Sequence, residues 1–274
     1  MSAADSVVTD EAVLYETTET GVAILTFNRP KRLNSWGPDI SAGFYACVDR
    51  AQADPAVRVI VLTGAGKGFC AGANLGGAGT IDEKLGDGDT DVSKLVGDRH
   101  PHFLTAVRKP IIAAVNGACV GIGLTHALMC DVRFAAAGAK FATAFTRRGL
   151  IAEYGISWIL PRLAGWGAAM DLLLTGRTFS AEEAAELGLV KEVVAPEQLM
   201  ARAVEYADDI ARNCSPASMA VIKQQAYGDA LRDVADVSDR AEKLMHESLL
   251  RRDVIEGITS FLEKRPPNFP PLSD

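Results

Sequence analysis

Residues 110–130 read PIIAAVNGACVGIGLTHALMC and contain no charged side chain. The stretch is long enough to cross a membrane, but Asn, Gly, Thr and His residues interrupt its apolar run. Its first part, 111–115, is a short apolar run of the kind that forms a buried strand. Asn116-Gly117 is a turn signal, and the remainder favours a buried helix over 122–130. We therefore interpret the stretch as a buried strand, a turn and a buried helix.

The preceding sequence extends this pattern into an α/β fold. Residues 22–28 (VAILTFN) and 57–63 (VRVIVLT) are nearly continuously apolar and rich in β-branched side chains, as in strands that helices cover on both faces. Between them, 38–53 opens with a proline and spaces its apolar residues on one helical face. This β-α-β order, with a further strand at 131–135, predicts a parallel or mixed sheet with helices packed on it.

The second half of the sequence favours helices. Helical patterns cover 155–165 and 167–175, and a capping box, Ser-x-x-Glu, starts a short helix over 180–188. A strand at 190–194 follows. From 196 to 264 the sequence is almost entirely helical, with apolar faces and no further strand to cover, so this tail is expected to need a partner surface.

The composition excludes several classes of protein. The chain has 274 residues, with 28 Lys and Arg against 35 Asp and Glu, a net charge of −7 and a pI of about 5.2. An acidic chain without a dense basic face is not expected to bind nucleic acid. With 48% hydrophobic and 23% charged residues, it is typical of a globular protein.

The cysteines and the first residues bear on the compartment. Five cysteines without a Cys-x-x-Cys pair indicate neither a zinc site nor a disulfide framework. Residues 1–16 lack the basic and apolar regions of a secretion signal. We therefore expect a cytoplasmic protein with no metal site.

Two glycine-rich segments are candidates for ligand binding. The first, 64–75, reads GAGKGFCAGANL; its spacing does not fit a phosphate-binding P-loop, and a plain tight connection is an equal alternative. The second, 116–125, reads NGACVGIGLT and opens a helix, whose free N–H groups favour an oxyanion. A dinucleotide fingerprint would need glycine at His126, and close helix–strand packing is the alternative here. Together, two clusters of backbone N–H groups indicate a site that stabilises an enolate or a tetrahedral oxyanion.

Five motifs carry a resemblance to a known family. They are NRPKRLN (28–34), AGANL (71–75), NGACVGIGL (116–124), CDVRFA (130–135) and LTGRTFSAEEAAELGLV (174–190). As an ordered set, from about residue 12 to Phe269, they resemble the crotonase superfamily of acyl-CoA enzymes. The resemblance implies a spiral core of ββα units over 1–195 and a helical trimerisation region over 196–274, in trimers or dimers of trimers.

The resemblance also implies the reacting groups. It places an oxyanion hole at the N–H groups of Ala73 and Ile122. Hydratases of this superfamily use two glutamates, and those positions hold Thr125 and Phe145 here, neither of which is a general base near neutral pH. Glu153 matches the position of the acid in relatives that shift a double bond.

Glu153 therefore carries the mechanistic prediction, and several roles stay open for it. The leading hypothesis is a Δ3-Δ2 enoyl-CoA isomerase in which Glu153 moves a proton between C4 and C2, with burial beside Phe145 and Tyr154 raising its pKa. The alternatives are an enoyl-CoA hydratase with Thr125 orienting water, an acyl-CoA binding protein without turnover, and a thioester hydrolase with Glu153 as nucleophile. Without catalysis, Glu153 would only complement the N-terminus of the helix 155–165.

We expect the reaction to need no cofactor beyond the coenzyme A that is part of the acyl-CoA substrate. Lys31 and Arg32 are expected near the CoA phosphates, and the side chain of Ile122 should narrow the pocket around the thioester. The acidic segment 76–100 is expected to be a surface loop rather than a cation site, and His100 and His102 at its end are weaker candidates for the acyl pocket. The remaining predicted contacts are Leu33, Ala71, Asn74, Leu75, Gly123, Thr125, Phe145 and Tyr154.

Overall fold

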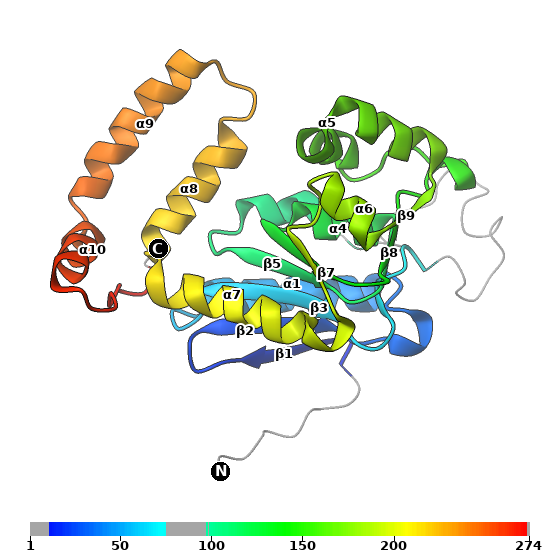
Figure 1. Ribbon diagram of the computed structural model, residues 1–274, viewed down its shortest axis with the longest axis horizontal. Coiled ribbons are helices and arrows are strands. Elements are labelled where there is room, and N and C mark those ends of the chain that lie inside the picture. The colour runs from blue at the N-terminus through cyan, green and yellow to red at the C-terminus, as the bar shows by residue number, and fades with distance from the viewer. Residues whose placement is uncertain (1–10, 75–96, 98, 273–274) are drawn as a thin grey trace, which may run out of the picture.

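A six-stranded, mostly parallel sheet forms the centre of the computed structural model, which describes residues 11–74, 97 and 99–272 (Figure 1). The strand order is β1-β2-β3-β5-β7-β10, with β1 antiparallel to β2 and the other neighbours parallel. The strands are β1 (Val13–Thr17), β2 (Val22–Phe27), β3 (Val59–Gly64), β5 (Ile111–Val115), β7 (Val132–Ala136) and β10 (Glu192–Val194). The α/β fold expected from the sequence is confirmed.

A second sheet is formed by four strands of three residues each. They are β4 (Gly68–Cys70), β6 (Ala118–Val120), β8 (Lys140–Ala142) and β9 (Thr178–Ser180). Short turns connect β3 to β4, β5 to β6 and β7 to β8, so each of these three central strands leads directly into a strand of the second sheet. Two of these turns need glycine, because a Cβ atom on Gly64 or Gly117 would lie 2.3 or 2.1 Å from a backbone oxygen.

The buried helix expected over 122–130 is present as α4, but no pattern in the sequence indicated the short strands β4 and β6. Strand β6 lies between the turn after residue 115 and this helix, and β4 lies inside the first glycine-rich segment. Strands of three residues are too short to show a periodicity in the sequence.

Helices of very different lengths connect and flank the strands. They are α1 (Pro38–Ala53), α4 (Ile122–Met129), α5 (Ile156–Thr175), α6 (Ala181–Glu186), α7 (Leu199–Asn213), α8 (Pro216–Gly228), α9 (Val234–Leu249) and α10 (Arg252–Glu263), with 3₁₀ turns η1 (Pro30–Arg32), η2 (Pro101–Ala106), η3 (Thr146–Arg148) and η4 (Pro196–Gln198). Helix α5 covers both segments predicted between 155 and 175, with a kink at Gly165, whose φ is +77°. None of these helices is long and apolar enough to span a membrane.

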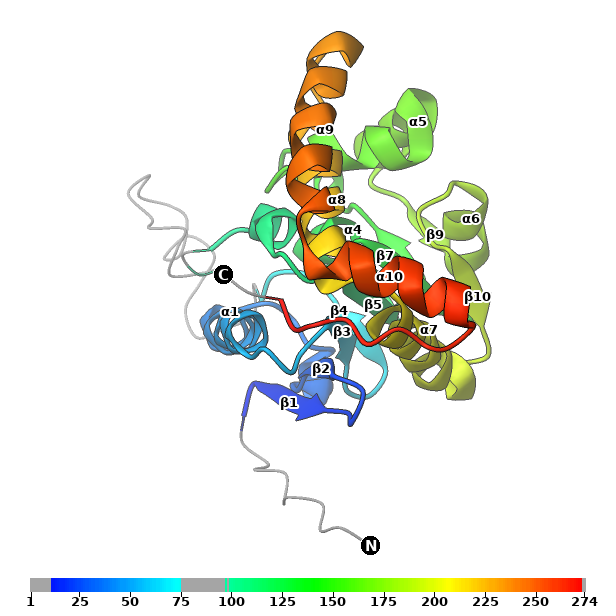
Figure 2. The same cartoon turned by 90° about the vertical axis from the view of Figure 1, so that its left-hand side faces the viewer.

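Helices cover both faces of the central sheet. On one face, alternate residues of β2, β3, β5 and β7 pack against the stripe Leu199, Ala203, Ala207 and Ala211 of α7. The other face packs against α1 and α4. Figure 2 shows α1 and α7 on opposite sides of β2 and β3. The expectation that the whole tail from residue 196 has no sheet to cover was therefore wrong for α7.

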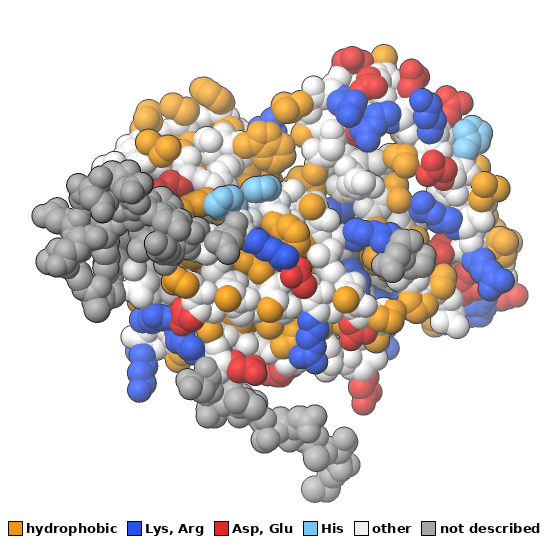
Figure 3. Space-filling view, turned by 180° about the vertical axis from the view of Figure 1, so that it is seen from behind, with side chains coloured by type: hydrophobic (Ala, Val, Ile, Leu, Met, Phe, Trp, Pro, Cys, Tyr) orange, Lys and Arg blue, Asp and Glu red, His pale blue; other side chains and the backbone are white. Residues whose placement is uncertain are grey.

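Helices α8 to α10 fit that expectation. Figure 1 shows α8 and α9 as an antiparallel pair that stands away from the sheets, and none of the residues of α9 is buried. Exposed hydrophobic side chains continue onto α10, where Ile255, Ile258, Phe261 and Leu262 are 58–81% exposed. Figure 3 shows such side chains along the edge of the molecule formed by these helices.

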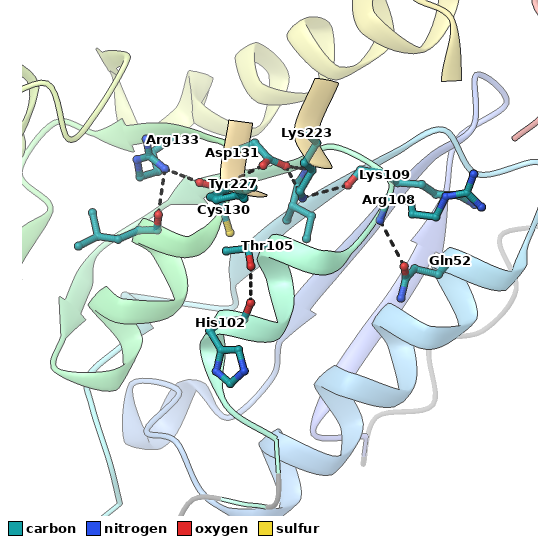
Figure 4. Close-up of polar contacts among 12 residues, drawn as sticks. Gln52, His102, Thr105, Arg108, Lys109, Cys130, Asp131, Arg133, Lys223 and Tyr227 are labelled. Atoms are coloured by element: carbon teal, nitrogen blue, oxygen red, sulfur yellow. Dashed lines mark hydrogen bonds and ion pairs between the residues drawn. The ribbon is translucent and has the colours of Figure 1, made fainter. Parts of the chain in front are cut away.

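Helix α8 is nevertheless held firmly to the central sheet through Asp131, which directly precedes β7 (Figure 4). One carboxylate oxygen of Asp131 accepts hydrogen bonds from the Lys223 ammonium group and from the N–H of Ile111, both at 2.7 Å. The hydroxyl of Tyr227 donates to the other oxygen at 3.2 Å. Asp131 thus has a structural role.

Candidate active site

A cavity of about 280 Å³ lies where the short parallel strands β4, β6 and β8 end. The residues that follow these strands form its wall, and the segment before α5 completes it. Its lining residues are Ala71, Gly72, Ala73, Val120, Gly121, Ile122, Thr143, Ala144, Phe145, Arg148, Leu150, Glu153 and Tyr154. Ligands commonly bind at the carboxyl ends of parallel strands, so this position is typical of a functional site.

The N–H group of Ala73 is left free by the way Trp36 pairs with its segment. Trp36 donates a hydrogen bond of 2.7 Å to the carbonyl of Gly72 and accepts one of 2.7 Å from the N–H of Asn74. In such a parallel bridge the residue between the two bonded neighbours turns its own N–H away from the partner strand. Among the described residues we find no acceptor for the Ala73 N–H.

The N–H group of Ile122 also has no acceptor within the described part of the chain, for a different reason. Ile122 is the first residue of α4, and the first N–H groups of a helix have no partner within it. The preceding residue, Gly121, has φ +55° and ψ −120°, a conformation that favours glycine. The carbonyl of Gly121 points back into the helix and accepts a bond of 3.0 Å from the N–H of Thr125, so the Ile122 N–H of the same peptide group points the opposite way.

Glu153 is the one carboxylate in the described wall of the cavity. Partial burial raises its pKa above the usual value, because desolvation disfavours the charged form. It lies three residues before α5, but no side chain caps that helix, and within residues 99–272 no hydrogen bond or ion pair of the Glu153 carboxylate is seen. The carboxylate therefore contacts the cavity without a competing partner among the described residues.

The chain matches the family model of enoyl-CoA hydratase/isomerase over residues 17–271. It belongs to the enoyl-CoA hydratase/isomerase family. A 1,2-epoxyphenylacetyl-CoA isomerase from Escherichia coli (strain K12) is 38% identical over 255 residues, which are 92% of this chain and 95% of that protein. These matches confirm that the chain is an enzyme of this family, within the crotonase superfamily expected from the sequence.

Solved structures agree with this assignment. The enoyl-CoA hydratase EchA12_1 from Mycobacterium marinum has 67% sequence identity and a TM-score of 0.69, covering 81% of this chain and 100% of that one. A probable enoyl-CoA hydratase/isomerase from Mycobacterium abscessus has 34% identity and a TM-score of 0.85, covering 95% and 99%. The enoyl-CoA hydratase/isomerase family thus includes similar proteins named for either reaction.

Phe145 and Thr125, which hold the two positions where the resemblance implies glutamates in hydratases, differ in their contact with the cavity. Phe145 is 4% exposed and lines the cavity. Thr125 is fully buried behind the cavity wall, and its hydroxyl donates to the carbonyl of Gly121 at 3.2 Å. Gly123, also predicted as a contact, lies against Cys70 instead, where an added Cβ atom would be 2.3 Å from the Cys70 carbonyl oxygen.

The other residues predicted from the family differ in their position relative to the cavity. Ala71 and Tyr154 line the cavity. Leu33 lies beside it, because its carbonyl accepts a bond of 3.1 Å from the N–H of Ala71. Lys31 is exposed on η1, and Arg32 forms an ion pair of 2.5 Å with Asp39. Asn74 contacts Trp36 through its N–H, whereas Leu75 and nearly all of the loop 76–100 lie outside the described residues.

The predicted histidines do not line this cavity. The centroid of the His100 ring lies 5.2 Å from the ring centroid of Tyr154 and 6.1 Å from that of His102. His102 lines a separate cavity of about 230 Å³ with Trp158 and Tyr227.

Sequence reasoning missed Arg148 in the wall of the cavity. Its guanidinium donates to the carbonyl of Ala144 at 3.1 Å. Ala144 has φ +60°, a conformation that is uncommon without glycine and that sets the direction of this segment. The pair Arg147-Arg148 next to Gly149 was the available signal, although two adjacent cations are ordinary on a surface turn.

Proposed function

We propose that this member of the family converts 3-enoyl-CoA thioesters into conjugated 2-enoyl-CoA thioesters. The observation that carries the proposal is the position of one carboxylate, Glu153, in a cavity that two free main-chain N–H groups also line. The N–H groups of Ala73 and Ile122 would bind the thioester oxygen. A pair of such donors stabilises negative charge as it develops on that oxygen.

The reaction then needs a single proton carrier. The Glu153 carboxylate takes a proton from C2, and the electrons of that bond move into a dienolate whose oxygen lies between the two amides. The same carboxyl group returns the proton to C4, so the double bond moves from C3–C4 to C2–C3 and no atom is gained or lost. The raised pKa of Glu153 supports this role, because it makes the carboxylate a stronger base.

The hydratase alternative is less well supported by the same cavity. Addition of water requires a group that activates water and a group that protonates the adjacent carbon. Phe145 has no ionisable group, and the Thr125 hydroxyl is already bonded to the Gly121 carbonyl. A hydratase with Glu153 as a lone catalyst is therefore our second candidate.

Basic residues close to the cavity would bind the CoA part of the substrate. Lys31 and Arg32 on η1 would bind CoA phosphates, since η1 adjoins the cavity through the Leu33 carbonyl and the Ala71 N–H. Proton transfer between two carbons of one substrate, assisted by hydrogen bonds, requires neither a metal ion nor a redox cofactor.

The exposed apolar faces of α9 and α10 would join copies of the chain into a trimer or a dimer of trimers.

Glu153→Gln tests the mechanism. With 3-enoyl-CoA as substrate and the absorbance of the conjugated product as the signal, we expect kcat to fall by about 10²–10⁴-fold, the typical worth of a general acid/base. Glu182→Gln is the matched control, because Glu182 is exposed on α6. Full isomerase activity in Glu153→Gln would contradict the proposal.

The same substrates separate the alternatives. Turnover of 2-enoyl-CoA to a 3-hydroxyacyl-CoA without turnover of 3-enoyl-CoA would favour the hydratase. Tight binding of several acyl-CoA esters with no product would favour a binding protein, and an acyl group trapped on Glu153 would favour a nucleophilic mechanism.

A further inference from the structure

Among the described residues, His126 is a buried polar side chain that the proposed reaction does not use and that contacts the segments of both amide donors. His126, on α4, is fully buried. Its ring lies 3.9 Å from the ring of Trp36, measured between centroids, at an interplanar angle of 31°. Its Nδ1 atom lies 2.8 Å from the carbonyl oxygen of Ile122, and its Nε2 atom lies 3.3 Å from the hydroxyl of Tyr45.

These contacts fix the protonation state of the ring. A carbonyl oxygen can only accept, so Nδ1 carries the hydrogen and donates it to Ile122, and Nε2 accepts from the Tyr45 hydroxyl. Burial lowers the pKa of His126 to about 3, so the ring is neutral at any pH at which the enzyme works. His126 is therefore a fixed hydrogen-bond donor and not a proton carrier.

Each ring of this pair is connected to one of the amide donors. Trp36 is bonded through its main chain to Gly72 and Asn74, the residues on either side of Ala73. His126 is bonded to the carbonyl of Ile122, while Thr125 is bonded to the carbonyl of Gly121, so the peptide groups on both sides of Ile122 are held. The contact between the two rings thus links the segments of Ala73 and Ile122, which are 49 positions apart in the chain.

Space filling alone does not explain why this residue is a histidine. Phenylalanine or leucine would fill a similar volume between Trp36 and Tyr45 without removing two ring nitrogens from water, which costs free energy unless both are bonded. The pairing of β4 with β6 already holds the two backbones together up to Cys70 and Cys119. His126 adds a hydrogen bond to the Ile122 carbonyl, beyond the end of that pairing, and an acceptor for the buried Tyr45 hydroxyl.

We propose that His126 is a positioning residue that sets the spacing of the Ala73 and Ile122 N–H groups, through its bond to the Ile122 carbonyl and its contact with Trp36. The inference rests on the proposed function only as far as these two N–H groups bind the thioester oxygen. It does not depend on which reaction follows.

His126→Phe removes the donor and keeps an aromatic ring against Trp36. We expect kcat with 3-enoyl-CoA to fall at least about fivefold, but by less than the ~10²–10³-fold cost of losing a complete oxyanion-hole donor, with KM within about twofold of wild type. His126→Asn carries a side-chain N–H at the position of Nδ1 and is expected to recover part of the lost kcat. Tyr45→Phe, which alters only the far side of the ring, is the matched control and should stay within about twofold of wild type.

Infrared spectroscopy measures hydrogen bonding by the two N–H groups of the oxyanion hole without any turnover. Butanoyl-CoA labelled with ¹³C at the thioester carbonyl cannot isomerise, and two hydrogen bonds to its oxygen lower the C=O stretching frequency. We expect a large part of this lowering to be lost in His126→Phe and retained in Tyr45→Phe. Melting temperatures of all variants, measured by circular dichroism, show that each compared protein is folded.

The outcomes distinguish the two proposals. If His126→Phe folds and keeps both the wild-type kcat and the wild-type frequency, His126 has no positioning role. If wild type lowers the frequency and His126→Phe does not, but wild type fails to convert 3-enoyl-CoA, the positioning role stands and the isomerase proposal is wrong. If wild type does not lower the frequency at all, both are wrong.

A measurement on the unmodified protein covers the case that His126→Phe does not fold. In protein labelled with ¹⁵N at histidine, the Nδ1–H signal of His126 can be assigned because the His126 ring stays neutral down to pH 5. Binding of butanoyl-CoA to the Ile122 N–H is expected to shift this signal. The ligand would bond to the N–H of Ile122, and the His126 ring bonds to the carbonyl of the same residue. An unchanged signal at saturating butanoyl-CoA would overturn the proposal.

Discussion

The hydroxyl of Thr125 donates a hydrogen bond of 3.2 Å to the carbonyl of Gly121, and the N–H of that same peptide group belongs to Ile122. The main-chain N–H of Thr125 donates to the same carbonyl at 3.0 Å. Hydrogen bonds in a chain polarise one another, so donors at the carbonyl make the N–H on the opposite side a better donor. Thr125 stands where the resemblance to the family implies a glutamate in hydratases, and its hydroxyl contacts the peptide group of Ile122 instead of the cavity.

Replacing Thr125 by valine removes the hydroxyl at nearly constant volume. Because the main-chain bond to Gly121 remains, we expect kcat for 3-enoyl-CoA to fall only about fivefold, less than the loss of a complete oxyanion-hole donor. Steady-state kinetics give the value, and Thr125→Ser, which restores the hydroxyl, should recover most of it. Equal activity of the valine and serine variants would show that the hydroxyl does not influence the site.

The pH dependence of the reaction follows from the raised pKa of Glu153. A general base must be ionised to accept a proton, so kcat/KM should fall as the pH is lowered through this pKa. The midpoint of that fall should lie above the pKa of an ordinary glutamate and should be absent from the residual activity of Glu153→Gln. A fall centred at or below the ordinary value would contradict the partial desolvation of this carboxylate.

The same shift has a consequence for stability. A carboxyl group whose pKa is higher in the folded than in the unfolded protein stabilises the fold fully below the unfolded pKa and loses that contribution as the pH rises through the folded pKa. Glu153→Gln should therefore raise the free energy of unfolding relative to wild type near pH 7, and the difference should shrink toward pH 4. Urea unfolding at the two pH values measures it, and a variant less stable than wild type at pH 7 would contradict the direction.

Long apolar runs made the central sheet predictable from the sequence. The cavity was harder to predict. The strands at 22–28 and 57–63 were identified because both faces of each are buried, which produces a continuous apolar sequence. Strands β4 and β6, whose ends carry the two amides, were missed because three residues between glycines show no pattern. The N–H groups themselves were placed by resemblance to the family and not by any local signal.

Helix α7 shows a second limit of sequence patterns. Its buried stripe against the sheet consists of Leu199 and three alanines, spaced four residues apart. Alanine contributes little apolar surface, so this face did not stand out against the stronger apolar faces of the later helices. Small side chains let the helix lie close to the strands, which is a property of packing and not of hydrophobicity.

Gly123→Ala tests whether this glycine serves packing, as the structure indicates. An added Cβ atom would lie 2.3 Å from the Cys70 carbonyl oxygen and 2.7 Å from its Cβ, so the start of α4 must move. We expect a loss of about 1–3 kcal/mol in the free energy of unfolding, typical of overpacking, together with reduced kcat. Gly167→Ala is the control, because no atom lies within 4 Å of its added Cβ, and it should gain up to about 1 kcal/mol. Similar stabilities of the two variants would show that α4 can shift freely.

The exposed side chains of α10 offer a test of the proposed assembly. Ile258 and Phe261 are 58% and 81% exposed, so aspartate at either position should change the free energy of unfolding of a single chain by no more than about 0.5 kcal/mol. In an interface, the same carboxylates would be buried without a partner, which strongly disfavours association. We therefore expect sedimentation velocity to show multiples of three chains of 29.1 kDa for wild type and smaller species for Ile258→Asp/Phe261→Asp. Lys243→Gln controls for a change of charge on the neighbouring helix α9 and should sediment like wild type. A double variant that sediments like wild type would exclude this face of α10 from the assembly, and the exposed residues of α9 would then be the next surface to alter.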